Sequence, residues 1–173
     1  MLFRSTEATG LKWAAAAASG SLTLLSTTSF STQTTSITGI STAYTDLVCW
    51  IRAPRFTSQN KLYIYPNGSA NSSYSLTIQN STVGVNTEVT TDAGVTTSAG
   101  DTQAGLYFEF RNYANTTYGK PYFAFGNTKA SNVQSFISAG FVPTASAITQ
   151  LDFYAEGGGN SWTGGQVLIY GRN

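Results

Sequence analysis

The chain has 173 residues, of which 41% are hydrophobic and 10% are charged, and its net charge is +1. This length is enough to bury the core of one domain, and the hydrophobic content excludes a disordered polypeptide. The nine Lys and Arg residues are scattered along the chain, which argues against binding to nucleic acid or to an anionic membrane through a basic patch.

The first ten residues, MLFRSTEATG, lack the apolar stretch that follows the basic residue of a signal peptide. We interpret residues 1–10 as an N-terminal arm and residues 11–173 as a single domain. A frayed terminus is the alternative interpretation of the arm. The candidate partner-binding residues of the arm are Leu2, Phe3 and Arg4.

Two-residue alternation of apolar and polar residues, which is typical of β-strands, dominates the chain from residue 21 onward. The segment 44–53, YTDLVCWIRA, carries apolar residues on both faces, as a central strand of a sandwich does. The stretch 83–101 is predicted to be a long excursion with one strand at most, and 132–143 fits either a short strand or a helical turn. The other predicted strands are 21–25, 35–40, 60–66, 73–79, 105–113, 120–127, 148–156 and 165–171.

About nine or ten short strands without helical interruptions predict an all-β fold, an antiparallel β-sandwich of jelly-roll-like type. Trp50 and Phe123 are expected to pack in the core or between the sheets. The final segment 154–171, YAEGGGNSWTGGQVLIYG, has no lysine among its glycines and is followed by no helical pattern. It therefore lacks the features of a phosphate-binding loop and is predicted to form a hairpin, with Trp162 folding back over the sheet edge.

Residues that could carry catalysis are few, since the sequence contains no histidine, which excludes Ser-His-Asp systems and the usual zinc sites. The single cysteine, Cys49, lies in an apolar run and is predicted to be a buried, inert thiol. Glu109 and Asp152 could form the carboxylate pair of a glycosidase, although a strand carboxylate is more often solvated or paired with Lys or Arg. Asp92 and Asp101 flank a glycine-rich loop but lack the spacing of a calcium loop. We expect no enzymatic activity, no cofactor and no metal site.

The ten tyrosines and three tryptophans leave two interpretations open. Exposed aromatic rings stack on sugars, which would make a lectin-like surface. Tyrosine also alternates along strands simply because it fits a half-buried pleated surface. The second interpretation is favoured for any single tyrosine.

Four segments, in this order along the chain, carry a resemblance to a known family. They are ITGISTAYTDLVCWIRA, LYIYPNGSANSSYS, FRNYANTTYGKPYFAFGN and ITQLDFYAEGGGNSWTGGQVLIYG. From Lys12 to Gly171 the chain resembles jelly-roll-like virion proteins of tailed bacteriophages, including phages of cyanobacteria. These occur as capsid cement (decoration) proteins and as tail-fibre domains. Ser41, Pro66 and Ile169 depart from the family pattern, and because the motifs are structural they carry over no functional residues.

The resemblance implies a virion protein made in the host cytoplasm without a signal peptide. The favoured role is a homotrimeric capsid cement protein that binds the outer head surface and clamps neighbouring major capsid subunits. The alternative is a tail fibre or other tail-associated protein that recognises host surface polysaccharide. Neither role involves nucleic acid or a membrane.

Overall fold

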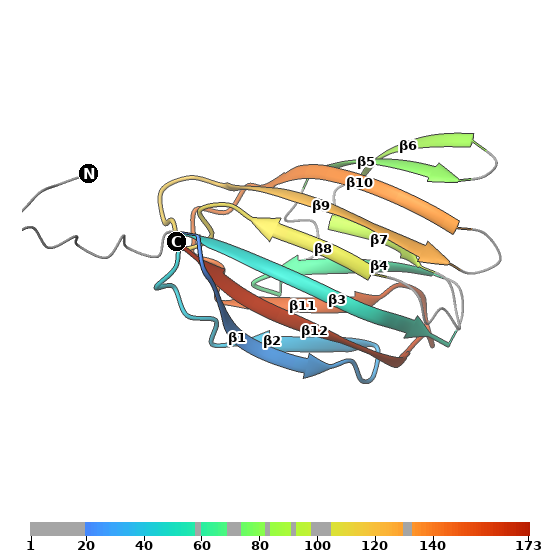
Figure 1. The fold of residues 1–173 in the computed structure, drawn as a ribbon, viewed down its shortest axis with the longest axis horizontal. Helices are drawn as coiled ribbons and strands as arrows, with labels where there is room; N and C mark the ends of the chain where they lie inside the picture. Colours follow the sequence, from blue (N-terminus) through green and yellow to red (C-terminus); the bar gives the residue numbers. More distant parts are fainter. Residues whose placement is uncertain are drawn as a thin grey trace, which may run out of the picture.

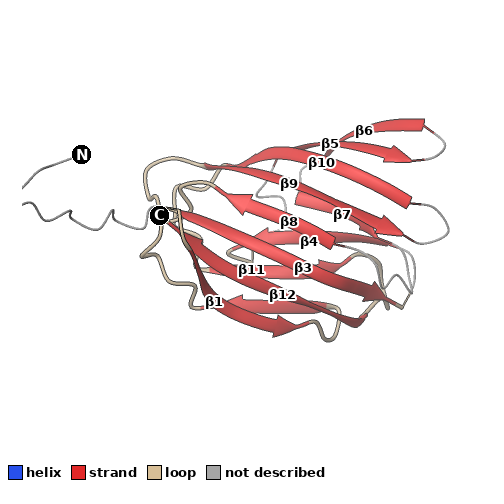
Figure 2. Ribbon diagram, viewed as in Figure 1, coloured by secondary structure: helices blue, strands red, loops and turns tan. Residues whose placement is uncertain are grey.

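The computed structural model describes residues 20–57, 60–68, 74–81, 84–90, 93–97, 105–129 and 133–173. These residues form twelve strands and no helix (Figure 2), so none of them belongs to a helix long and apolar enough to cross a membrane. The strands are β1 (Leu22–Ser29), β2 (Thr34–Thr38), β3 (Asp46–Phe56), β4 (Asn60–Pro66), β5 (Tyr74–Ser81), β6 (Gly84–Thr90), β7 (Ala93–Thr97), β8 (Gly105–Phe110), β9 (Lys120–Lys129), β10 (Val133–Val142), β11 (Gln150–Ala155) and β12 (Trp162–Arg172).

The strands form two antiparallel sheets that pack face to face (Figure 1). The larger sheet has eight strands in the order β1-β12-β3-β8-β9-β10-β5-β6, and the smaller has four in the order β2-β11-β4-β7. One hydrophobic cluster fills the space between them, with Cys49, Ile51 and Phe108 from the larger sheet and Ile64 and Phe153 from the smaller. Burial of this shared core holds the two layers together.

The strand order identifies the topology as a jelly roll with two insertions. Strands β1, β12, β3 and β8 of the larger sheet and β2, β11, β4 and β7 of the smaller sheet have the jelly-roll order. When the inserted hairpins are left out, consecutive strands lie in opposite sheets except for β4 and β7, which are neighbours in the smaller sheet. The hairpins β5–β6 and β9–β10 are inserted between these strands and extend the larger sheet. The predicted antiparallel sandwich of jelly-roll-like type is confirmed, with twelve strands among the described residues instead of nine or ten.

Two segments contain more strand than the sequence pattern predicts. The stretch 83–101 contributes β6 and β7, which belong to different sheets. The ambiguous segment 132–143 contains the ten-residue strand β10, which pairs with β9 and β5. Its alternation is inverted, because Ser138 is buried whereas Ile137 and Phe141 are exposed. The usual strand signal is an apolar residue at each core-facing position. In β10 large apolar residues lie at outward-facing positions, so this signal does not identify the strand.

The predicted hairpin at the end of the chain is wrong. Strand β11 lies in the smaller sheet and β12 in the larger one, so the connection 156–161 crosses between layers. Gly164 and Gly165 lie inside β12 and not in the loop. Trp162 does not cover the sheet edge: it is buried in the core, 4.1 Å from Phe30 between ring centroids.

Gly165 marks an irregularity in the pairing of β12 with β3. Its φ is +102°, and a Cβ atom there would lie 2.7 Å from both the carbonyl oxygen of Ala53 and the Cα of Pro54. We therefore expect Gly165→Ala to lower the free energy of unfolding by about 2 kcal/mol or more. Urea denaturation measures this, with Gly158→Ala as the matched control, since no atom lies within 4 Å of its added Cβ. Equal stability of the two variants would contradict the assignment.

Candidate functional site

The outer face of the eight-stranded sheet carries a row of apolar side chains that crosses five neighbouring strands. The register aligns Leu168 of β12, Trp50 of β3, Tyr107 of β8, Phe125 of β9 and Ile137 of β10; we call these five residues the apolar row. Exposed fractions are 43% for Trp50, 44% for Phe125 and 55% for Ile137. Tyr107 lies between two rings, edge-on to Trp50 at 5.5 Å and stacked on Phe125 at 4.8 Å. Aromatic side chains thus form a continuous surface instead of isolated exposed groups.

The prediction that Trp50 and Phe123 pack in the core or between the sheets is wrong, because both lie on this outer face, with 43% and 42% of their surface exposed. Alternation along β3 explains the position of the tryptophan. Leu47, Cys49 and Ile51 point into the core, so Trp50 must point away from it. Both faces of the strand are apolar in sequence, and only the tertiary packing decides which one is covered.

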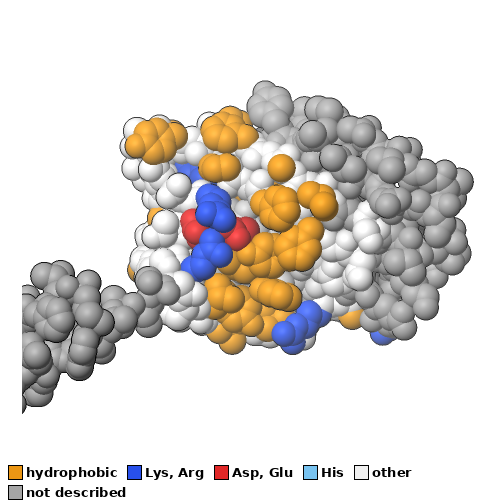
Figure 3. All heavy atoms as spheres, turned by 45° about the horizontal axis from the view of Figure 1, so that its top comes forward, with side chains coloured by type: hydrophobic (Ala, Val, Ile, Leu, Met, Phe, Trp, Pro, Cys, Tyr) orange, Lys and Arg blue, Asp and Glu red, His pale blue; other side chains and the backbone are white. Residues whose placement is uncertain are grey.

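The exposed apolar surface extends beyond the apolar row. Leu24 of β1 pairs with Tyr170 of β12, and Phe123 of β9 pairs with Glu109 of β8. Figure 3 shows such side chains gathered on one face around a compact group of charged residues. Seven large apolar residues of this face are 42–55% exposed: Leu22, Leu24, Trp50, Phe123, Phe125, Ile137 and Phe141. Together they present about 600 Å², taking ~150–250 Å² for a fully exposed aromatic side chain, which is at the upper end for the largest patch on a typical monomer.

The charged group is a closed network centred on Arg172. The guanidinium of Arg172 lies 2.6 Å from Asp46 Oδ2 and 2.6 Å from Glu109 Oε1. Arg111 Nε lies 2.5 Å from the same glutamate oxygen, and the Tyr107 hydroxyl donates a hydrogen bond to Glu109 Oε2 at 2.5 Å. The second oxygen of Asp46 accepts a hydrogen bond from the backbone N–H of Asn112. Because each carboxylate is already paired, this network stabilises the fold and offers no free carboxylate to a ligand.

The contacts of the network shift the pKa values of Glu109 and Tyr107 in opposite directions. Burial acts to raise the pKa of Glu109, but the hydrogen bonds from Tyr107 and Arg172, with the positive charges of Arg172 and Arg111, outweigh it and lower the pKa below 4.5. Burial, together with the hydrogen bond to Glu109, raises the pKa of Tyr107 to about 12. At neutral pH Glu109 is therefore ionised and Tyr107 neutral.

A second row crosses the same five strands, two residues away from the apolar row on each strand. It consists of Gln166 of β12, Arg52 of β3, Gly105 of β8, Asn127 of β9 and Ser135 of β10; we call it the polar row. None of its four polar side chains forms a hydrogen bond or ion pair with another residue in the part of the chain that the structure describes. Their donors and acceptors are therefore available to a ligand.

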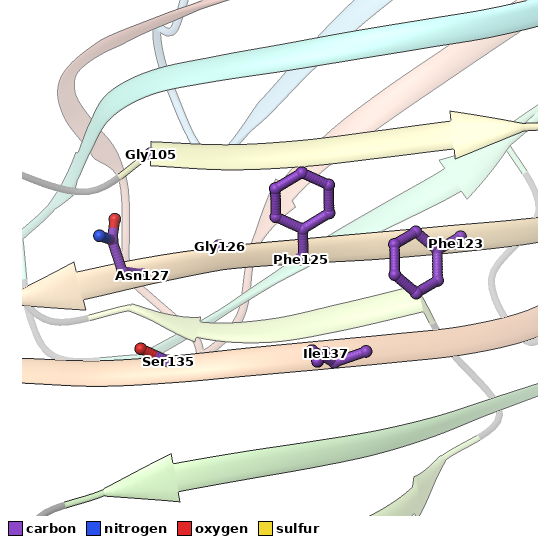
Figure 4. Close-up of a pocket in the computed structure, with 7 residues that line it drawn as sticks. All are labelled: Gly105, Phe123, Phe125, Gly126, Asn127, Ser135 and Ile137. Carbon is purple, nitrogen blue, oxygen red and sulfur yellow. The ribbon is translucent and has the colours of Figure 1, made fainter.

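Gly105 interrupts the polar row and leaves a depression in the face. Two adjoining hollows of about 460 and 330 Å³ share Gly105 and Phe125 as lining residues; we call them together the Gly105 hollow. In Figure 4, Asn127 and Ser135 lie at one end of the larger hollow, and Phe123 and Ile137 line the other. A ligand lying there would contact apolar side chains on one side and hydrogen-bonding groups on the other.

The residues predicted to bear chemistry are not brought together. Glu109 and Asp152 lie on β8 and β11, in different sheets, so the proposed carboxylate pair does not form. Asp92 and Asp101, which flank the glycine-rich loop, lie outside the described residues. Within the described residues no group of three or more His, Cys, Asp or Glu residues is placed to hold a metal ion. Cys49 is buried, as predicted, and burial raises the pKa of its thiol. The partner-binding candidates of the arm, which lie outside the described residues, are Leu2, Phe3 and Arg4.

The class of protein defined by these observations is an antiparallel jelly-roll sandwich with an exposed, largely apolar sheet face. Comparison with protein-family models, with curated proteins and with solved structures found no match.

Proposed function

We propose that the protein is a non-catalytic structural protein of a bacteriophage particle, a capsid cement (decoration) protein. It binds the outer head surface and stabilises the contacts between major capsid subunits, as a homotrimer placed at the local threefold positions of the lattice. The observation that supports docking on another protein is the apolar outer face, with seven large side chains between 42% and 55% exposed. The resemblance of the sequence to phage virion proteins supports the particle as the place where it docks.

The size of the face suits a protein partner. Its exposed large apolar groups present about 600 Å², and a typical stable interface buries about 800 Å² on each side. The Arg172 network can also be covered without leaving an unpaired charge, because each of its carboxylates already faces an arginine. Binding of this kind stabilises the assembled capsid by mass action and requires no chemistry from the protein.

Binding to heads that lack the protein tests this function. Phe123 and Phe125 are exposed, so the double change to serine should leave the fold intact. We expect it to reduce occupancy on heads at least about tenfold, corresponding to about 1.4 kcal/mol of lost binding free energy. Tyr118→Ser is the control, because Tyr118 is 65% exposed in the connection between β8 and β9. Full occupancy by the double variant would rule out docking through this face.

A tail-associated receptor-binding protein is the second candidate function. The observation that favours it is the polar row beside Trp50 and Tyr107, because sugars are held by ring stacking combined with hydrogen bonds to polar side chains. A glycan array of host surface polysaccharides, probed with the purified protein, separates the two functions. Saturable binding that is lost in Trp50→Ala would favour the tail role over the head.

A further inference from the structure

We propose that the Gly105 hollow is the docking site for an extended segment of the partner protein. The segment inserts one large apolar side chain, such as Phe or Leu, into the hollow and places a carboxylate one or two residues away, against Arg52. This inference rests on the proposed function, since it names the part of the partner that the outer face receives.

The walls of the hollow select an apolar side chain. Phe123, Phe125 and Ile137 line the larger part, and Trp50 and Tyr107 the smaller. The absent side chain at Gly105 makes the space, because a Cβ built there would meet only Asn127 Oδ1, at 3.8 Å. The hydrogen-bonding groups of the larger part, Asn127 and Ser135, lie at one end of it, and Ile137 at the other end offers a sugar neither such a group nor a ring to stack on. An apolar side chain is therefore the better match.

The polar row offers hydrogen-bonding partners to the backbone of the docking segment, on both sides of its apolar side chain. Asn127 and Gln166 carry amides, and Ser135 a hydroxyl, none of which is bonded to another side chain or backbone group of the described chain. An extended peptide presents an N–H or C=O group about every 3.3 Å, and side-chain amides can bond to either. The five strands of the row, about 4.8 Å apart, offer room for roughly six extended residues.

Charge determines where the carboxylate lies. Arg52 is exposed and makes no ion pair within the described residues, while Asp46 and Glu109 are both occupied by Arg172. Arg52 pairs directly with Gly105 across β3 and β8, so their Cα atoms lie about 5 Å apart. This spacing corresponds to one or two residues of extended chain, and an acidic group there would complement the only unpaired charge of the polar row.

The test measures binding of labelled nine-residue peptides to the full-length protein by fluorescence polarisation. The peptides consist of Ser and Thr with a central Phe, Leu or Ala, and with Asp or Asn one or two positions further on. We expect Phe and Leu peptides to bind at least about tenfold more tightly than Ala peptides, and Asp peptides to bind more tightly than Asn peptides. Gly105→Leu should abolish binding by filling the hollow, whereas Gly158→Leu, the same change at an open position away from the face, should not. Arg52→Gln should remove the preference for Asp while retaining that for Phe.

Several outcomes would overturn the inference. Equal binding of Phe and Ala peptides, or binding unaffected by Gly105→Leu, would show that the hollow is not an anchor site. Saturable binding of soluble oligosaccharides, tested with dextran and chito-oligosaccharide fragments and lost in Gly105→Leu, would assign the hollow to glycans instead. If the Phe123 and Phe125 double variant loses occupancy on heads while no peptide binds, this inference fails and the proposed function stands. If that variant keeps full occupancy, the proposed function itself fails.

Discussion

Replacing Trp162 by alanine is expected to lower the free energy of unfolding by about 3–5 kcal/mol, the usual cost of removing a buried aromatic side chain. The indole is 5% exposed and lies between Phe30 and Phe56, with ring centroids at 4.1 and 4.4 Å. Its Nε1–H donates a hydrogen bond to the carbonyl oxygen of Phe153 at 3.3 Å. Alanine would leave a cavity between the two sheets and a buried carbonyl without this partner. Urea denaturation measures the change.

Trp50→Ala is the matched control for this prediction, because it removes the same side chain from the outer face. Trp50 is 43% exposed and contacts the edge of Tyr107, so its loss should cost less than about 1 kcal/mol of stability. The two variants therefore separate a core tryptophan from a surface one. A cost for Trp50→Ala as large as that for Trp162→Ala would mean that the outer face is covered within the folded chain and is not an interaction surface.

The sequence predicts the positions of the strands better than it predicts which face of each sheet is buried. Strand alternation is local, and it correctly located most strands, including the central strand around Leu47 and Cys49. Which face of the larger sheet is covered is a tertiary property. The exposed residues Trp50 of β3, Phe123 of β9 and Ile137 of β10 are as apolar as those of many cores. The sequence pattern therefore assigns Trp50 and Phe123 to the wrong side of the sheet.

The connections between strands and the candidate site also depend on tertiary structure that a local sequence pattern does not contain. A strand, a glycine-rich loop and a second strand have the same pattern whether they form a hairpin or cross between sheets, and β11–β12 crosses. The Gly105 hollow requires Arg52, Gly105 and Asn127 to be aligned across three strands, and that register depends on pairings distant in sequence. The only local signal was a glycine at the start of a strong strand, which by itself more often marks a strand end.

Replacing Arg172 by methionine is expected to lower the free energy of unfolding at neutral pH by about 2–3 kcal/mol. This is below the ~3–5 kcal/mol for breaking a fully buried ion pair, because the Arg172 side chain is 25% exposed and Glu109 keeps Arg111 and Tyr107 as partners. Methionine preserves most of the apolar stem, so the loss reports the charge. Arg52→Met is the control, since this exposed arginine of the same face has no ion pair in the described structure, and its replacement should cost less than about 0.5 kcal/mol.

The pH dependence of the Arg172→Met effect distinguishes lost charge pairing from lost packing. The pKa of Glu109 is lower in the folded protein than its ordinary value of 4.5. Its charge therefore contributes stability that is present above pH 4.5 and is lost as the pH falls through the folded-state pKa. Removing Arg172 takes away part of that contribution, so the stability difference between wild type and Arg172→Met should be largest near neutral pH and narrow below pH 4.5. Urea denaturation at a series of pH values measures it, and a difference that stays constant across the series would assign the loss to packing instead.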